Sequence, residues 1–221
     1  MIFADEDIDE LARTQKQQHL WVNKSSPFIT KFGSHYGLYS VVVSGLISAA
    51  FNNEKGVQTS LLATQAMITS GIWTQIIKQI TGRERPDASY MISHIEGGRW
   101  HGPFAKFLEN SADDISGFSY DAFPSGHTAT AFSIATVFAT QYSDNKAVPV
   151  LFYSAATLVG ISRLTEHKHW ASDVFVGAIF GYLSGKQVVR NFNRTHQNSQ
   201  KDKREIRFVQ HGNQVGVSIL W

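Results

Sequence analysis

FPSGHTATAF, residues 123–132, places Pro, Ser, Gly and His directly ahead of a small, apolar run. The run predicts a helix over 128–142, for which Ser125 can supply the N-cap. A helix N-terminus presents free N–H groups and a positive dipole end, and Gly126 lets an oxyanion approach the backbone closely. His127 as a cation is unfavourable near that dipole, so a bound anion would account for it. A capped helix with an incidental histidine explains the same residues, and the rest of the chain must decide.

Uncharged segments on both sides of this helix predict an all-α protein, a helical bundle of about five or six helices. The uncharged segments are 38–51, 57–77 and 147–161, and 174–189, whose one charged residue is Lys186, forms the last helix. Residues 4–20 predict an amphipathic helix, and Pro27 within SSPF predicts a break. Residues 82–122, including SADDISG, predict a long polar loop, which is typical of a functional region.

We expect the chain to have three parts. Residues 1–35 form an N-terminal amphipathic helix and linker, 36–190 the bundle that carries the site, and 191–221 a basic tail with a short β-hairpin about Gly212 and Asn213. The tail contains no recognisable chemistry, and a structural cap is the interpretation that we favour.

Composition excludes several classes of protein. The chain has 221 residues, and its net charge of +2 is too small and dispersed for a nucleic-acid binder. It contains no cysteine, which rules out disulfides and thiolate metal sites. The acidic start MIFADEDIDELARTQ has no basic region of a signal peptide, so an exported form would have lost its leader.

The signals for a membrane location conflict. A spanning helix needs roughly 20 apolar residues, and 128–142 and 147–161 fall short, while 57–77 is rich in Thr, Ser and Gln. The mean hydropathy of −0.17 also argues against a fully embedded bundle. However, 147–161 has no polar face. Basic residues follow the last helix, as on a cytoplasmic flank or in a solvated tail: Lys186, Arg190, Arg194, Lys201, Lys203 and Arg204. The balance favours membrane association.

Two further stretches carry charged side chains that suit an anion. In KQITGRERP, residues 78–86, Lys78 and Arg85 stand two helical turns apart, and Pro86 favours an extended backbone at Arg85. In SRLTEHKHWASD, residues 162–173, Arg163 ends an apolar helix, where its guanidinium can fork onto phosphate oxygens. Taken alone, such cations are usually solvated.

The second of these stretches also holds a histidine–carboxylate pair. His169 and Asp173 are four apart, so a carboxylate can fix one ring nitrogen and leave the other as a nucleophile or base. His167, His169 and Asp173 could instead bind a metal. At alternate positions the two histidines would face apart, and no glutamate-rich motif accompanies them. We therefore expect neither a metal nor another cofactor.

Together, the patterns K-x6-RP, PSGH and SR-x5-H-x3-D resemble those of the type 2 phosphatidic acid phosphatase and vanadium haloperoxidase superfamily, from Lys78 to Asp173. The resemblance implies a helical bundle in which His169 attacks phosphorus and carries a phosphohistidine. It implies that Asp173 orients His169 and that His127 protonates the leaving oxygen, without a metal. The residues implied to hold the phosphate are Lys78, Arg85, Arg163, Ser125 and Gly126.

The expected activity is therefore hydrolysis of a phosphomonoester or diphosphate. We favour a phosphorylated lipid as the substrate, because soluble acid phosphatases of the group tend to carry charges in the helix before the SR motif, whereas 147–161 has none. The alternatives are a soluble periplasmic acid phosphatase acting on a small phosphate ester, a vanadium haloperoxidase, and a non-catalytic helical membrane protein. The expected location is the cell envelope, with the site facing outside the cytoplasm.

Overall fold

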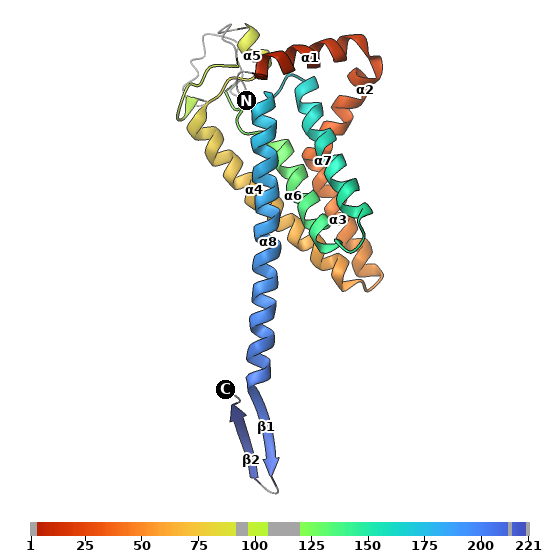
Figure 1. The fold of residues 1–221 in the computed structure, drawn as a ribbon, viewed down its shortest axis with the longest axis vertical. Coiled ribbons are helices and arrows are strands. Elements are labelled where there is room, and N and C mark those ends of the chain that lie inside the picture. The colour runs from red at the N-terminus through yellow and green to blue at the C-terminus, as the bar shows by residue number, and fades with distance from the viewer. Residues whose placement is uncertain (1–3, 92–96, 106–119, 212–213, 220–221) are drawn as a thin grey trace.

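The computed structural model describes residues 4–91, 97–105, 120–211 and 214–219. In this part of the chain, five long helices form an elongated bundle (Figure 1), in line with the predicted all-α class. They are α3 (His35–Ala50), α4 (Glu54–Thr81), α6 (Gly126–Gln141), α7 (Ala147–Thr165) and α8 (Ala171–Glu205). The segment SADDISG lies outside the described residues.

Helix α6 is the centre of the bundle and packs against α4, α7 and α8. Its interior face is made of small residues, so that neighbouring helices approach closely. Ile134 and Val137 join Leu62 of α4 and Val188 of α8 in one core cluster. The stretch that opens the candidate site therefore also begins the most buried helix.

Glycines at every fourth position of α8 bring it against α6. A Cβ at Gly177 would lie 2.5 Å from the carbonyl oxygen of Ser125, and one at Gly181 would overlap the carbonyl oxygen of Ala129. At Gly185 it would lie 2.7 Å from the Cβ of Thr136. Small residues at this spacing let two helix backbones touch. The seam fixes the distance between α8 and the start of α6.

Shorter helices cover one end of the bundle. Figure 1 shows α1 (Asp5–Gln18) lying across the end where α8 begins, with α5 (Pro86–Met91) beside it. Helix α2 (Leu20–Ile29) and a 3₁₀ turn (Thr30–Gly33) lead into α3. The predicted helix over 4–20 is confirmed within a few residues.

The predicted break at Pro27 is wrong, because α2 continues through this residue. A proline inside a helix removes one backbone donor and strains the preceding turn. Here the turn is anchored from outside, since buried Ser26 Oγ lies 2.7 Å from Thr165 Oγ1 of α7. The α-helix ends two residues later, at Ile29.

Two helices are longer than their apolar sequences predict. Helix α7 extends four residues beyond Ile161, to Thr165, and among the described residues it alone is long and apolar enough to cross a membrane. Helix α8 continues through the basic residues after 189 to Glu205. Charged residues support a helix once it has begun, so a loss of apolar character does not mark its end.

Beyond α8 the backbone forms two antiparallel strands, β1 (Ile206–His211) and β2 (Gln214–Ile219), with Ile206 opposite Ile219 and His211 opposite Gln214. The expected turn residues, Gly212 and Asn213, lie outside the described part of the chain. The strands lie at the opposite end of the molecule from α1 (Figure 1).

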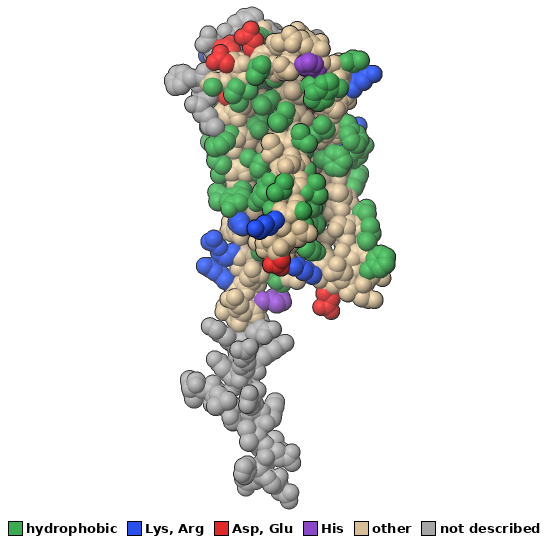
Figure 2. All heavy atoms as spheres, turned by 45° about the vertical axis from the view of Figure 1, so that its right-hand side comes forward, with side chains coloured by type: hydrophobic (Ala, Val, Ile, Leu, Met, Phe, Trp, Pro, Cys, Tyr) green, Lys and Arg blue, Asp and Glu red, His purple; other side chains and the backbone are tan. Residues whose placement is uncertain are grey.

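The sides of the bundle are apolar. Figure 2 shows hydrophobic side chains spread over one face, with Lys and Arg gathered where α8 leaves the bundle. On α3, α4, α7 and α8 the exposed apolar residues include Val42, Leu46, Leu61, Ile68, Ile72, Val150, Leu151, Leu158, Ile179 and Leu183. A surface of this extent calls for an apolar partner.

We predict that Gly181→Ala destabilises the protein by about 1–3 kcal/mol, because the new methyl group must displace the α6 backbone. The matched control is Gly71→Ala in α4, where a Cβ meets nothing within 4 Å. That change should leave stability unchanged or raise it by up to about 1 kcal/mol. Thermal unfolding of both purified variants measures the difference. Equal melting temperatures would contradict the close packing of Gly181 against the α6 backbone.

Candidate active site

The three sequence motifs meet at the end of the bundle that α1 covers. There α4 ends, α6 begins, α7 ends and α8 begins (Figure 1). The backbone N–H of Ser125 donates to the carbonyl oxygen of Asp173 over 3.0 Å, which ties the start of α6 to the first turn of α8. Residues far apart in the sequence thereby reach one small volume.

Lys78 and Arg85 converge although no single helix carries both. Helix α4 ends at Thr81, because Gly82 adopts a left-handed φ of 54°. Lys78 Nζ donates to the backbone carbonyl of Asp121 and lies 3.4 Å from Asp121 Oδ2. Arg85 Nε donates to Asp121 Oδ1 over 2.8 Å. Asp121, which the motifs did not predict, is the shared counter-ion of both cations.

The start of α6 has the predicted cap. Ser125 is buried, and its Oγ accepts a hydrogen bond from Thr128 Oγ1 over 2.9 Å and a long one from Thr128 N. Gly126 faces Lys78, whose Cε would lie 4.0 Å from a Cβ at this position. The serine hydroxyl thus serves the helix, while the free N–H groups of the first turn lie near a cation.

Arg163 is buried in the last turn of α7. Its Nη1 donates to Thr30 Oγ1 over 2.7 Å and to Glu166 Oε2 over 3.1 Å. Its Nε is buried and has no hydrogen-bond partner among the described residues. A buried donor without a partner costs roughly 1–3 kcal/mol, so this N–H is suited to an acceptor supplied by a ligand.

The hydrogen bond of His169 fixes its tautomer. The side chain is buried, and Nδ1 lies 2.6 Å from the carbonyl oxygen of Ala122. A carbonyl only accepts, so Nδ1 carries the proton and Nε2 of the neutral ring carries the lone pair. Asp173 was expected to make this contact. Its nearest oxygen lies 3.9 Å from Nδ1, within electrostatic reach but beyond hydrogen-bonding distance.

The surroundings favour the neutral form of both histidines. Burial, followed by the charges of Lys78 and Arg163, lowers the pKa of His169 well below its ordinary value of 6.5. Burial and the same cations, Arg163 foremost, lower the pKa of His127 to about 3. Both histidines therefore lie within the electrostatic field of the three predicted cations.

The carboxylate of Asp173 forms its ion pair with Arg83. Arg83, fully buried, donates from Nη1 to Asp173 Oδ1 over 2.5 Å and to Ser172 Oγ over 2.7 Å. Arg83 Nη2 donates to Asp5 Oδ2 over 2.7 Å. The other oxygen of Asp173 accepts from the backbone N–H of Trp170 over 2.8 Å. Arg83 thus lies between two buried carboxylates.

The model of the PAP2 superfamily matches residues 60–197, well over half of the chain. The chain belongs to the PAP2 superfamily. The resemblance inferred from the three motifs is thereby confirmed, and the matched segment contains every residue predicted for the site.

Several curated relatives of this PAP2 protein are named as phosphatases. A lipid A 1-phosphatase from Porphyromonas gingivalis is 45% identical over 71 residues, which cover 32% of this chain and 16% of that protein. Lipid phosphate phosphatase 2 from Arabidopsis thaliana is 30% identical over 129 residues, 52% of this chain and 44% of the relative. The chain therefore spans less than half the length of these two relatives.

Two solved structures share the fold. The crystal structure of LpxE from Aquifex aeolicus has a TM-score of 0.58 at 23% identity, and the similarity covers 82% of this chain and 93% of that one. The transmembrane PAP2-type phosphatidylglycerolphosphate phosphatase from Bacillus subtilis gives 0.57 at 24% identity, over 87% and 85%. At these identities the likeness concerns the fold of the PAP2 bundle.

Three features of this PAP2 site were missed or misjudged from the sequence. Arg83 stands two residues before Arg85 in KQITGRERP, and Asp121 stands two before FPSGH, so both were adjacent to a recognised motif. Their charges were visible, but their burial was not. His167, considered as a metal ligand with His169, instead places Nδ1 2.9 Å from Asp9 Oδ1 of α1.

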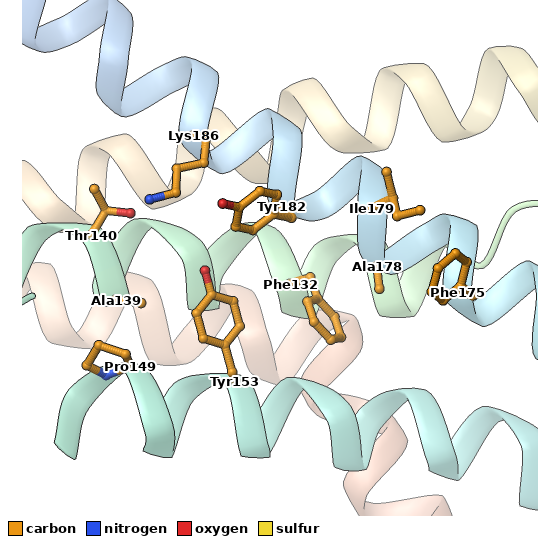
Figure 3. Close-up of a pocket in the computed structure, with 10 residues that line it drawn as sticks. All are labelled: Phe132, Ala139, Thr140, Pro149, Tyr153, Phe175, Ala178, Ile179, Tyr182 and Lys186. Carbon is orange, nitrogen blue, oxygen red and sulfur yellow. The ribbon is translucent and has the colours of Figure 1, made fainter. Parts of the chain in front are cut away.

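A separate hollow lies on the side of the bundle. A groove of about 540 Å³ opens between α6, α7 and α8 (Figure 3). Its wall is largely aromatic and aliphatic, with Phe132, Tyr153 and Tyr182, and Lys186 lies at one end. None of the predicted site residues lines it. The groove belongs to the apolar flank of the PAP2 bundle.

We predict that Arg83→Met destabilises this PAP2 protein by about 3–5 kcal/mol, because Asp5 and Asp173 would remain buried without their shared cation. Arg99→Met, which removes the same charge from an exposed position, should change stability by less than about 0.5 kcal/mol. Chemical unfolding of both variants checks this. Similar losses of unfolding free energy in the two variants would contradict the role of Arg83 as the shared counter-ion of Asp5 and Asp173.

Proposed function

We propose that this protein is a metal-independent phosphatase that removes phosphate from a phosphorylated lipid through a phosphohistidine intermediate. The observation that carries the proposal is the convergence of Lys78, Arg85 and Arg163 around a histidine whose Nε2 carries a free lone pair. Phosphoryl transfer requires fixed positive charge on the equatorial oxygens and a nucleophile in line with the leaving group.

In the first step, His169 Nε2 attacks phosphorus. The P–N bond forms, the bond from phosphorus to the leaving oxygen breaks, and His127 gives that oxygen a proton. Lys78, Arg85, Arg163, Ser125 and the Gly126 amide would hold the phosphate oxygens. In the second step, a water molecule gives a proton to His127 and attacks phosphorus, which breaks the P–N bond and releases inorganic phosphate.

The charge of the substrate completes this mechanism. Burial and the surrounding cations lower the pKa of His127 and so oppose a proton on its ring. A bound phosphate dianion offsets those cations, so it favours the protonated imidazole that the leaving group requires. Asp173 is 3.9 Å from His169 Nδ1 and stabilises the positive ring of the phosphohistidine electrostatically.

A lipid substrate and a membrane location fit the flanks of the bundle. Helix α7 is long and apolar enough to span, and large apolar side chains are exposed on α3, α4, α7 and α8. Relatives include proteins named as lipid A and lipid phosphate phosphatases. Lys186, Arg190 and Arg194 lie farther along α8 than its first turn, which carries Asp173. Positive residues favour the cytoplasmic side, which would place the site outside, in the cell envelope.

We predict that the purified protein releases inorganic phosphate in EDTA, faster from detergent-dispersed lipid phosphates than from soluble monoesters. His169→Ala should reduce the rate by at least about 1,000-fold, because it removes the nucleophile. The control is His196→Ala, near the other end of α8, which should keep the wild-type rate. If His169→Ala and His196→Ala release phosphate at the same rate, the role proposed for His169 is refuted. Activity that is lost in EDTA and restored by Zn²⁺ would refute metal independence.

We also predict that His169 stays neutral at about pH 6, where an ordinary imidazole is mostly protonated. Protonation removes the lone pair, so kcat/KM falls as the pH drops through the pKa of this ring. Because that pKa is lowered, we expect kcat/KM, corrected for ionisation of the substrate, to fall only well below pH 6.5. NMR titration of the His169 ring without substrate gives an independent value. A midpoint at or above 6.5 would contradict the burial of the nucleophile among cations.

A further inference from the structure

Helix α1 carries two buried carboxylates, although it lies outside residues 60–197, which the family model matches. Asp5 has 0% and Asp9 has 2% of its surface exposed. A spacing of four residues places them on one face of the helix. Charged groups are rarely buried unless they are paired and hydrogen-bonded, so this face of α1 is built for specific partners.

The partners of Asp5 lie at the start of α8. Asp5 Oδ1 accepts from the backbone N–H of Ser172 over 2.8 Å, and Oδ2 accepts from Ser172 Oγ over 2.6 Å. Ser172 is the second residue of α8, where backbone N–H groups have no partner within the helix. Asp5 thus acts as an N-cap supplied by another helix. It is also joined to Asp173 through Arg83.

The partner of Asp9 is His167, which precedes His169 in the sequence, whereas Ser172 follows it. Asp9 Oδ1 is 2.9 Å from His167 Nδ1, and Asp9 Oδ2 accepts from Arg13 Nε over 2.9 Å. His167 adopts a φ of 54°, which a side chain with a Cβ rarely takes. Such a conformation is strained and persists where its surroundings impose it. The contact with Asp9 is one such restraint.

We propose that Asp5 and Asp9 of α1 are positioning residues for His169, holding the loop that carries it at His167 and at Ser172. The proposal rests on the proposed function, because it assigns His169 the attack on phosphorus. Helix α1 touches neither the phosphate nor the reacting nitrogen in this scheme. It fixes the backbone two residues before the nucleophile and three residues after it.

The size of the effect follows from geometry. A displacement of a reacting group by about 1 Å can cost on the order of 100-fold in rate. Asp5→Asn keeps the shape of the side chain but replaces one acceptor oxygen with a donor that faces Arg83 and Ser172. The three cations that would hold the phosphate oxygens are Lys78, Arg85 and Arg163, and among the described residues the partners of their hydrogen bonds lie outside α1. The loss should therefore fall on kcat.

The test compares Asp5→Asn and Asp9→Asn with Asp7→Asn, which makes the same change on the exposed face of α1. Phosphate release is measured per folded molecule, with the folded fraction taken from thermal unfolding. We expect kcat to fall about 10- to 100-fold for Asp5→Asn and less for Asp9→Asn, with KM within about twofold of wild type. Asp7→Asn should match wild type. Equal kcat in all three variants would overturn the proposal.

A second measurement separates failure of this proposal from failure of the proposed function. The ring signals of His169 are followed by NMR in wild type and in the same variants, without substrate. We expect Asp5→Asn to shift or broaden these signals and Asp7→Asn to leave them unchanged. If the wild type releases no phosphate, the proposed function fails and this measurement alone decides whether α1 positions the histidine. Unchanged His169 signals in Asp5→Asn would overturn the proposal.

Discussion

A guanidinium buried between two carboxylates is the interaction on which the rest of this site depends. Arg83 has no exposed surface, and it joins Asp5 of α1 to Asp173 of α8. Such a group is stable inside a protein only when its charge and its donors are both satisfied. The Arg83 side chain also donates to the carbonyl oxygen of Gly97 over 3.0 Å and 2.5 Å. Arg83 therefore connects the first helix, the segment after α5 and the helix that follows His169.

The remaining charges are arranged so that the site stays positive. Asp121 is shared by Lys78 and Arg85, and Glu166 contacts Arg163, so three cations face two carboxylates. In a region with little water, this excess gives a strong attraction for an anion. Burial, together with the same field, lowers the pKa of His169 and so favours the neutral ring that the proposed attack on phosphorus requires. In the proposed mechanism, the cations that would bind phosphate thus also help to keep the histidine in its reactive form.

The sequence predicted the meeting of the motifs more reliably than the contacts inside the site. Charge-free runs after PSGH and before Arg163 predicted a helical bundle, and its helices bring Lys78, Arg85, His127 and His169 to one end. Arg83 was missed because an arginine in a polar loop has the same pattern whether it is solvated or buried. The limits of α2 and α8 were missed because Pro27 and the basic residues after 189 weaken a helix locally, whereas tertiary contacts or earlier turns maintain it.

The row of glycines at which α8 packs against α6 does not by itself determine how far α8 is shifted along its axis relative to α6. Because these glycines recur every four residues, a screw displacement of α8 by four residues, about 6 Å, would bring one glycine close to the place of the next. The seam therefore defines how near the two helices lie, but it is nearly periodic along their length. The bond from Ser125 N to the Asp173 carbonyl and the contact of Asp5 with Ser172 occur once each. These few polar contacts at the rim select the longitudinal register, whereas the apolar interior sets only the spacing.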